Sequence, residues 1–278
     1  MTDYLTGIFP PIPTPFNSDE EINFNSLKSN LSLLQKFPLK GYVVFGSNGE
    51  SVFLTREEKV KLISTVREHI PADKTLIAGT GSDSIKETIN LSNEAAKSGA
   101  NFALVITPFF FQKEITSKAL ISYYIAIADR VKIPIIIYNV PKFTNVNITP
   151  ATVCELTQHP NIKGIKNSTE NIVELSEMVF SSPKSFSVIA GTGSVLLPAL
   201  QAGCSGGILA LANIAPEECC VIQKKYSEGK INEAREIQSR MIPVNRAVTA
   251  TYGVAGLKAA MELLGYFGGL TRRPLQPL

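Results

Sequence analysis

The 278-residue sequence has no tryptophan, only two histidines and only four cysteines. Apolar runs such as 133–138 and 208–212 are far shorter than the roughly 20 residues of a transmembrane helix, so no membrane contact is expected. The cysteines lack disulfide spacing and any Cys-x-x-Cys, which indicates reduced thiols. His69 and His159 are expected to be exposed at helix ends. A zinc site and a Ser-His-Asp triad therefore both lack support.

The sequence also has little net charge, because 27 basic minus 24 acidic residues gives +3. This balance is too weak to indicate nucleic acid or an anionic membrane surface as a partner. The first residues resemble neither a signal peptide nor an Arg-rich presequence. We expect a cytoplasmic protein, or a mitochondrial one if a presequence has been removed, and a small molecule as its partner.

Short apolar runs recur at the spacing of βα units from the start of the chain to residue 210. They are 7–12, 41–45, 75–78, 102–106, 133–138, 162–166, 186–190 and 206–210. Near-continuous Val, Ile and Leu are typical of strands covered on both faces, as in a parallel sheet with outer helices. Eight consecutive βα units predict an α/β fold of the (β/α)8 TIM barrel type. Prolines from Pro10 to Pro15 restrict the first run to an interrupted or terminal strand.

Helix signals lie between and after these runs. Thr55-Arg-Glu-Glu58 is a capping box, and Thr149-Pro150 pairs an N-cap with a proline at the first helical position. Further helices are predicted from 216, over 231–242 and over 252–264. We therefore expect a barrel over 1–215 and C-terminal helices over 216–278 within one structural unit. These helices either form a subunit interface or cap the barrel.

The chemistry of such a barrel lies at the carboxyl ends of its strands, so the polar residues that follow each run are the candidates. Lys166 ends the sixth run, in Lys166-Asn-Ser168. If Ile162, Gly164 and Lys166 share one side of the strand, Lys166 points into the barrel mouth and Lys163 points outward. Burial disfavours a charged lysine, and the free amine forms a Schiff base with a ketone. Two alternatives remain. Lys166 is a structural lysine in an ion pair, or the inward and outward positions along the strand are displaced by one residue, so that Lys166 points outward.

Two other strand ends carry candidates. Tyr138 ends the fifth run and can transfer protons, or it is a buried tyrosine with a single hydrogen bond. Ser47, Asn48 and Gly49 follow the second run and offer donors that suit a carboxylate, although this is also ordinary turn chemistry. The Gly-Thr-Gly-Ser repeats at 79–82 and 191–194 lack the third glycine of a dinucleotide fingerprint, so neither NAD nor FAD is expected.

Three motifs together resemble a known family. Gly46-Ser-Asn-Gly-Glu50, Tyr138-Asn-Val-Pro141 and Gly164-Ile-Lys166 occur in the order found in the dihydrodipicolinate synthase/N-acetylneuraminate lyase family of class I aldolases. The resemblance covers nearly the whole chain. Within the family, the sequence is most similar to the 4-hydroxy-2-oxoglutarate aldolases. The segments that support this closer similarity are 46–50, 53–55, 158–162, 210–213, 247–249 and 265–269.

The resemblance implies a (β/α)8 barrel with C-terminal helices, a homotetramer, and no metal or organic cofactor. It implies that Lys166 forms a Schiff base with a 2-oxo acid, that Tyr138 is the acid and base, and that Ser47 belongs to a proton relay. Ser47 and Asn48 are expected to hold the substrate carboxylate. The other expected substrate-binding residues are Gly191, Ile208 and Ser168. The implied reaction is cleavage of 4-hydroxy-2-oxoglutarate to pyruvate and glyoxylate.

Two positions depart from the family pattern. Phe110 stands where the family commonly has a tyrosine that reaches a neighbouring subunit's relay. Either water replaces that hydroxyl with some loss of rate, or the protein binds 2-oxo acids with little turnover. Phe143 stands where the synthase branch has an arginine just after the strand-5 motif, which argues against lysine biosynthesis. The nearest alternative is an aldolase for 2-keto-3-deoxy sugar acids or another pyruvate-dependent member of the family.

Overall fold

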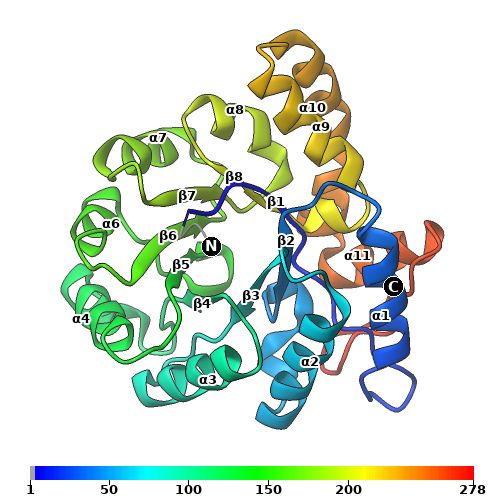
Figure 1. The fold of residues 1–278 in the computed structure, drawn as a ribbon, viewed down its shortest axis with the longest axis horizontal. Helices are drawn as coiled ribbons and strands as arrows, with labels where there is room; N and C mark the ends of the chain where they lie inside the picture. Colours follow the sequence, from blue (N-terminus) through cyan, green and yellow to red (C-terminus); the bar gives the residue numbers. More distant parts are fainter. Residues whose placement is uncertain (1–3) are drawn as a thin grey trace.

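The computed structural model describes residues 4–278 and contains an eight-stranded parallel sheet rolled into a barrel (Figure 1). The strands are β1 (Gly7–Phe9), β2 (Gly41–Val44), β3 (Thr75–Gly79), β4 (Phe102–Ile106), β5 (Ile135–Asn139), β6 (Ile162–Asn167), β7 (Ser187–Ala190) and β8 (Gly206–Ile208). The predicted (β/α)8 barrel is confirmed. Residues 1–3, the start of the segment without a targeting pattern, lie outside the described residues.

The first strand is short because of its prolines. β1 ends at Phe9, directly before Pro10, since a proline has no N–H to donate to a neighbouring strand. β1 pairs with β8 on one side, and the chain beyond it meets β2 through the Ile12 N–H, which donates to the Val43 carbonyl at 2.8 Å. This irregular pairing closes the ring.

Helices follow the strands and surround the barrel (Figure 1). They are α1 (Phe24–Leu34), α2 (Arg56–His69), α3 (Ile85–Lys97), α4 (Ser117–Ala128), α5 (Pro141–Thr144), α6 (Pro150–Leu156), α7 (Ile172–Ser181), α8 (Leu196–Gln201), α9 (Pro216–Ser227), α10 (Ile231–Arg246) and α11 (Gly253–Leu263). Short 3₁₀ helices are η1 (Ser47–Gly49), η2 (Ser51–Phe53), η3 (Gln112–Glu114), η4 (Gly193–Val195) and η5 (Ala210–Asn213), and η6 (Ala247–Thr251) is a π-helix. No helix within residues 4–278 is long and apolar enough to cross a membrane.

The two sequence-predicted helix starts are confirmed. Thr55 accepts from the Glu58 N–H, and the Glu58 carboxylate accepts from the Thr55 N–H, so α2 begins with a complete capping box. Thr149 caps α6 ahead of Pro150. These bonds satisfy backbone N–H groups that have no partner inside the helix, which fixes where each helix begins.

Apolar side chains form two layers, one inside the barrel and one between the barrel and its helices. The inner layer includes Phe9, Ile136, Tyr138, Ile189 and Ile208. The outer layer beside β4 to β7 includes Ile135, Ile137, Ile162 and Ile165. Alternate strand residues thus face opposite layers, as the pleat of a strand requires.

A bulge in β6 corrects the alternation that we expected for this strand. Ile162 is the register partner of Ile135, but Gly164 is the partner of Ile136, so β6 has one extra residue, Lys163, at this point. Ile162 therefore lies in the outer layer with Ile165 and does not share the side of Lys166. A bulge of this kind changes which face the following residues present.

The C-terminal helices pack beside the start of the barrel. α9 and α10 lie together and next to α8, while α11 lies on the side of α1, near the C-terminus (Figure 1). Gln238 of α10 is 5% exposed, accepts from the Leu197 N–H and donates to the Gly193 carbonyl, so it joins α10 to η4 and α8, the two elements that follow β7. The π-helix η6 then turns the chain back over the mouth of the barrel.

Candidate active site

A cavity of about 410 Å³ opens at the carboxyl-terminal ends of the strands, where barrel enzymes carry their chemistry. It brings together the residues expected to act on the substrate. They are Ser47, Asn48, Tyr138, Lys166, Ser168, Gly191 and Ile208. A larger cavity of about 630 Å³ lies at the opposite end of the strands and is lined by Thr6, Lys40 and Cys220. Volume alone would therefore select a cavity without any of these residues.

Lys166 and Tyr138 lie side by side in the first cavity. They are register partners on β6 and β5, so their side chains leave the sheet on the same side. Lys166 is only 4% exposed, and its Nζ lies 4.2 Å from the centre of the Tyr138 ring. A lysine amine is thus held in a largely dry site, against the face of an aromatic ring that attracts its charged form. In the part of the chain that the structure describes, no acidic side chain forms an ion pair with it.

Ser47 joins this pair from the second strand. Its Oγ lies 3.2 Å from the Tyr138 Oη, and either hydroxyl can be the donor. Ser47 and Asn48 belong to η1, the short helix that follows β2. A hydroxyl pair of this geometry can pass a proton between the cavity and the Tyr138 phenol.

Two asparagines beneath the cavity hold β5 and β6 together. The Asn139 side-chain amide donates to Asn167 Oδ1 at 3.2 Å and to Asn147 Oδ1 at 2.7 Å. Both Asn139 and Asn167 are fully buried. They directly follow Tyr138 and Lys166 and so fix the strand ends from which these residues project. Sequence reasoning missed this role, because an asparagine after a strand is also ordinary turn chemistry.

Gly191 permits a close approach between the ends of β6 and β7. A Cβ at this position would lie 2.1 Å from the Ser168 Oγ and 2.7 Å from its Cα. The Gly191 N–H donates to the Asn167 carbonyl at 2.7 Å, which keeps the two loops together. Any larger residue would push Ser168 out of its place in the cavity wall.

The C-terminal helices supply the remaining wall. Val248 and Thr249 of η6, and Gly253 and Val254 at the start of α11, line the cavity. The Thr249 carbonyl accepts a hydrogen bond of 2.9 Å from Nζ of Lys142, which also lines the cavity. These residues therefore complete the cavity, a role that the sequence did not reveal because a π-helix has no distinct residue pattern.

Other titratable groups do not compete with Lys166 as nucleophiles. Burial raises the pKa of Cys204 to about 12, that of Cys220 to about 11, and that of Cys219 well above its usual value. Thiols with such values remain protonated at neutral pH and are weak nucleophiles. Among residues 4–278, no group of three or more His, Cys, Asp and Glu side chains is placed to hold a metal ion.

The two histidines are less exposed than expected. Both are half-buried, because each side chain is held by a neighbour. The His69 Nε2 lies 2.8 Å from the Ser32 Oγ, and the His159 Nε2 lies 3.1 Å from the Asp129 Oδ1. Neither lines the cavity.

Phe110 and Phe111 stand on the outer surface, where they are 75% and 70% exposed. Their rings meet edge to face at 5.0 Å. The Asp83 carboxylate accepts from the N–H groups of Phe109 and Phe110 at 2.7 and 2.8 Å, which holds this loop in one conformation. Phe110 does not line the cavity of its own chain.

Comparison with known proteins identifies the family of this chain. The sequence profile described as the Dihydrodipicolinate synthetase family matches residues 4–278. The 4-hydroxy-tetrahydrodipicolinate synthase of Methanothrix thermoacetophila is 33% identical over 273 residues, which are 98% of this chain and 91% of the relative. The enzyme of the same name from Archaeoglobus fulgidus is 34% identical over 272 residues, which are 98% of this chain and 92% of the relative.

Solved structures with the same architecture come from the same family. Dihydrodipicolinate synthase DapA-2 of Bacillus anthracis superposes with a TM-score of 0.95 at 26% identity, covering 100% of this chain and 94% of the other. YagE, a prophage protein of the dihydrodipicolinic acid synthase family from E. coli K12 in complex with pyruvate, superposes with a TM-score of 0.92 at 28% identity, covering 99% and 93%. The chain with the buried lysine of β6 thus belongs to the Dihydrodipicolinate synthetase family, whose members are carbon–carbon lyases.

Proposed function

We propose that this chain is a class I aldolase that cleaves 4-hydroxy-2-oxoglutarate to pyruvate and glyoxylate through a Schiff base on Lys166. The observation that carries the proposal is the buried Lys166 amine beside Tyr138 in a cavity of about 410 Å³. The pyruvate bound by YagE supports a pyruvate-type 2-oxo acid as the substrate. A mostly enclosed amine suits imine chemistry, because water would otherwise hydrolyse the intermediate.

The reaction begins when Nζ of Lys166 attacks the C2 carbonyl of the substrate and water is lost. The resulting protonated imine draws electrons from the C3–C4 bond. Tyr138 takes the proton of the C4 hydroxyl as that bond breaks, and glyoxylate leaves as the aldehyde. The enamine is then protonated at C3, and hydrolysis of the imine releases pyruvate and the free amine. The imine is the electron sink, so the proposed steps use no metal or organic cofactor.

The surrounding residues bind the substrate and move its protons. Ser47 passes the proton between Tyr138 and the cavity through the 3.2 Å contact of their hydroxyls. Ser47 and Asn48 hold the C1 carboxylate at the turn after β2. Gly191 and Ile208 line the 2-oxo acid pocket, and Ser168 contributes a hydroxyl to its wall.

The choice of aldehyde product rests on the residues after β5. Relatives such as that of Methanothrix thermoacetophila are named 4-hydroxy-tetrahydrodipicolinate synthase. In the synthase branch an arginine is expected where this chain has Phe143, which lines the cavity without any charge. Our choice of 4-hydroxy-2-oxoglutarate rests on this replacement and on the sequence segments that resemble 4-hydroxy-2-oxoglutarate aldolases. An aldolase for 2-keto-3-deoxy sugar acids uses the same lysine and tyrosine and is the comparison in the test.

Assembly and domain organisation complete the proposal. We propose a homotetramer, in which the exposed Phe110 and Phe111 lie against another subunit. An apolar, fixed surface pair of this kind is typical of a protein contact. We also propose that residues 216–278 form one structural unit with the barrel over 1–215, because the cavity wall needs both.

Borohydride reduction in the presence of pyruvate tests the Schiff base. Intact and peptide mass spectrometry should find a reduced pyruvyl adduct on Lys166 and none in Lys166→Ala. The matched control is Lys163→Ala, three residues earlier on the same strand, which should keep the adduct. A wild-type protein that stays unmodified would refute the class I mechanism.

Cleavage assays then separate the substrates. We expect 4-hydroxy-2-oxoglutarate to be cleaved with a kcat/KM at least about tenfold above that for 2-keto-3-deoxygluconate, a difference of about 1.4 kcal/mol in the barrier. Comparable values, or faster cleavage of the sugar acid, would overturn the choice of substrate while leaving the Schiff base intact.

A further inference from the structure

Glu50 is a buried acidic residue that directly follows the turn assigned to the substrate carboxylate. It is only 2% exposed and adopts a left-handed backbone conformation, with a φ of 56°. A residue with a side chain adopts this conformation only where its surroundings hold it there. Glu50 does not line the cavity with Lys166, so it has no part in the reaction as proposed.

Its carboxylate is held by two groups from the C-terminal part of the chain. Glu50 Oε1 lies 2.5 Å from Nζ of Lys258 on α11, which makes an ion pair. Glu50 Oε2 accepts a 2.8 Å hydrogen bond from the Arg272 N–H. Both side chains of the ion pair are almost completely buried, at 2% and 0% exposure. An ion pair removed from water in this way depends strongly on both partners.

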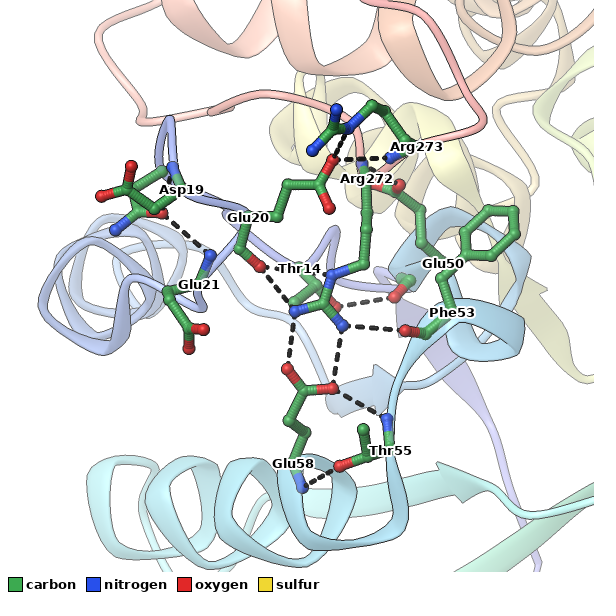
Figure 2. A network of polar contacts seen from close by, with 12 residues as sticks. Thr14, Asp19, Glu20, Glu21, Glu50, Phe53, Thr55, Glu58, Arg272 and Arg273 are labelled. Carbon is green, nitrogen blue, oxygen red and sulfur yellow. Dashed lines mark hydrogen bonds and ion pairs between the residues drawn. The ribbon is translucent and has the colours of Figure 1, made fainter.

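The second partner, Arg272, is itself fixed by its side chain, which lies among Glu20, Phe53 and Glu58 (Figure 2). Its guanidinium donates to both oxygens of Glu58, at 2.8 and 2.6 Å, and to the Phe53 carbonyl at 2.8 Å. It also donates to the Glu20 carbonyl at 2.6 Å. The N–H that reaches Glu50 therefore comes from a backbone segment that cannot shift without breaking these bonds.

The first partner, Lys258, is fixed in a similar way. Its Nζ donates to the Leu270 carbonyl at 2.6 Å and lies 4.7 Å from the centre of the Phe16 ring. Lys258 belongs to α11, whose first residues, Gly253 and Val254, line the catalytic cavity. The ion pair thus joins the wall formed by residues 47–48 to the wall formed by α11.

We propose that Glu50 is a positioning residue, which holds the Ser47–Asn48 turn where it binds the substrate carboxylate. The turn is a short 3₁₀ helix outside the sheet, so its place depends on the contacts at its ends. On one side, Thr14 Oγ1 donates to the Gly49 carbonyl at 2.7 Å. On the other side, Glu50 ties the turn to α11 and the C-terminal tail. This inference rests on the proposed function, because it needs Ser47 and Asn48 to bind a carboxylate.

A purely structural role for Glu50 makes a different prediction. Loss of folding or general loosening would lower all reactions of Lys166 together. Misplacement of the turn would lower only those reactions in which the substrate has a carboxylate to bind. Two ketones that differ in this group, pyruvate and hydroxyacetone, therefore separate the two roles, since both can form a Schiff base with an amine.

The test compares borohydride trapping of both ketones in Glu50→Gln, Lys258→Met and the wild type. Glu50→Gln keeps the shape of the side chain and an acceptor for the Arg272 N–H, but it removes the charge that Lys258 needs. We expect the pyruvate concentration for half-maximal trapping to rise at least about tenfold, equal to about 1.4 kcal/mol. We expect trapping of hydroxyacetone to change less than threefold. Glu94→Gln, which breaks the surface ion pair with Arg56, is the matched control.

Folding of each variant is checked by circular dichroism before trapping. If Glu50→Gln and Lys258→Met do not fold, Glu50→Asp and Lys258→Arg, which keep the charges but change their distance, are measured in the same way. Parallel loss for both ketones, or no change for pyruvate, would overturn the proposal for Glu50. Absence of a pyruvate adduct in the wild type would instead refute the proposed function.

Discussion

Tyr138 stands opposite Lys166 because β6 contains one residue more than β5 over the same stretch. Ile162 pairs with Ile135, Gly164 pairs with Ile136, and the extra residue is Lys163. If Lys163 were instead paired with Ile136 in a regular ladder, the register would place the apolar Ile165 opposite Tyr138 and turn the lysine amine away from the cavity. A local irregularity of the sheet thus brings the two central groups together, as bulges next to active sites often do.

Deletion of Lys163 tests this relationship. Without the extra residue, Ile162, Gly164, Ile165 and Lys166 match Ile135, Ile136, Ile137 and Tyr138 one to one, so the shortened strand is expected to lose the bulge, keep the amine beside Tyr138 and keep the pyruvate adduct. Lys163→Ala keeps the bulge and should keep the adduct. Mass spectrometry after borohydride reduction is the measurement, with circular dichroism to confirm the barrel. A folded deletion variant without the adduct would contradict the assignment of Lys163 as the extra residue of the bulge.

Tyr138→Phe separates imine formation from cleavage. The ring that faces Nζ of Lys166 is retained, while the Oη that contacts Ser47 at 3.2 Å is lost. We expect kcat for 4-hydroxy-2-oxoglutarate to fall about 10²- to 10⁴-fold, as is usual for loss of a general acid or base. The pyruvate adduct should still form. Tyr226→Phe on α9 is the control, and cleavage within a few-fold of wild type in Tyr138→Phe would rule out the phenol as the acid and base.

Lys142→Met tests recognition of the second carboxylate of the substrate. Among residues 4–278, the charged residues that line the cavity are Lys142, Lys166 and Glu170, and Lys142 is the cation not used for the imine. Loss of a charge-assisted hydrogen bond should lower kcat/KM for 4-hydroxy-2-oxoglutarate by about 10- to 100-fold. The analogue 4-hydroxy-2-oxopentanoate, with a methyl group in place of that carboxylate, should change far less. Equal effects on both compounds would exclude this role, and Lys184→Met serves as the exposed-lysine control.

Phe110→Tyr distinguishes an active aldolase from a binding protein. We expect the wild type to cleave its substrate with water in the relay, and the new hydroxyl to raise kcat by less than about tenfold. Phe111→Tyr, next to it in the same loop, should have no effect. Steady-state kinetics and light scattering, which should find a tetramer, are the measurements. A wild type with no turnover that gains activity only in Phe110→Tyr would instead support a 2-oxo-acid-binding protein.

The Arg272–Glu58 pair gives a pH-dependent prediction. Hydrogen bonds from Arg272 lower the pKa of Glu58 below its usual 4.5. An acid with a lower pKa in the folded state stabilises the protein above the pKa of the unfolded chain, and this contribution is lost as pH falls through the folded value. Glu58→Gln should therefore lower the free energy of unfolding by about 1–2 kcal/mol at neutral pH. Urea unfolding should show that the difference in free energy of unfolding between the wild type and Glu58→Gln shrinks as the pH falls from 5 to 3. Glu21→Gln is the control and should show no such change. A difference for Glu58→Gln that stays constant over this range would contradict the assignment.

Much of the fold was predictable from local patterns. Apolar runs such as 102–106 gave strand bounds that match β4, and the capping box at Thr55 and Glu58 gave the start of α2. Pro10 correctly limited the first strand. In each case the residues that decide the structure lie within a few positions of one another.

The alternation of β6 could not be predicted, because a bulge leaves no mark in the sequence itself. Gly164 and Ile165 are compatible with either register, and only pairing with β5 selects one. The exposure of His69 was missed for a similar reason, since its partner Ser32 lies 37 residues away. The cavity wall from Val248 to Val254 depends on a π-helix whose formation is a matter of packing.

The sequence by itself determined the barrel, the strand ends at which Lys166, Tyr138 and Ser47 stand, and the family resemblance that suggests an aldolase. Hydrophobic periodicity, caps and prolines act locally, so they can be read in order along the chain. Only the tertiary structure decided that Lys166 faces Tyr138, that η6 and α11 close the cavity, and that Glu50 meets Lys258 and Arg272. Those contacts join residues up to 222 positions apart, and their geometry depends on how whole elements pack.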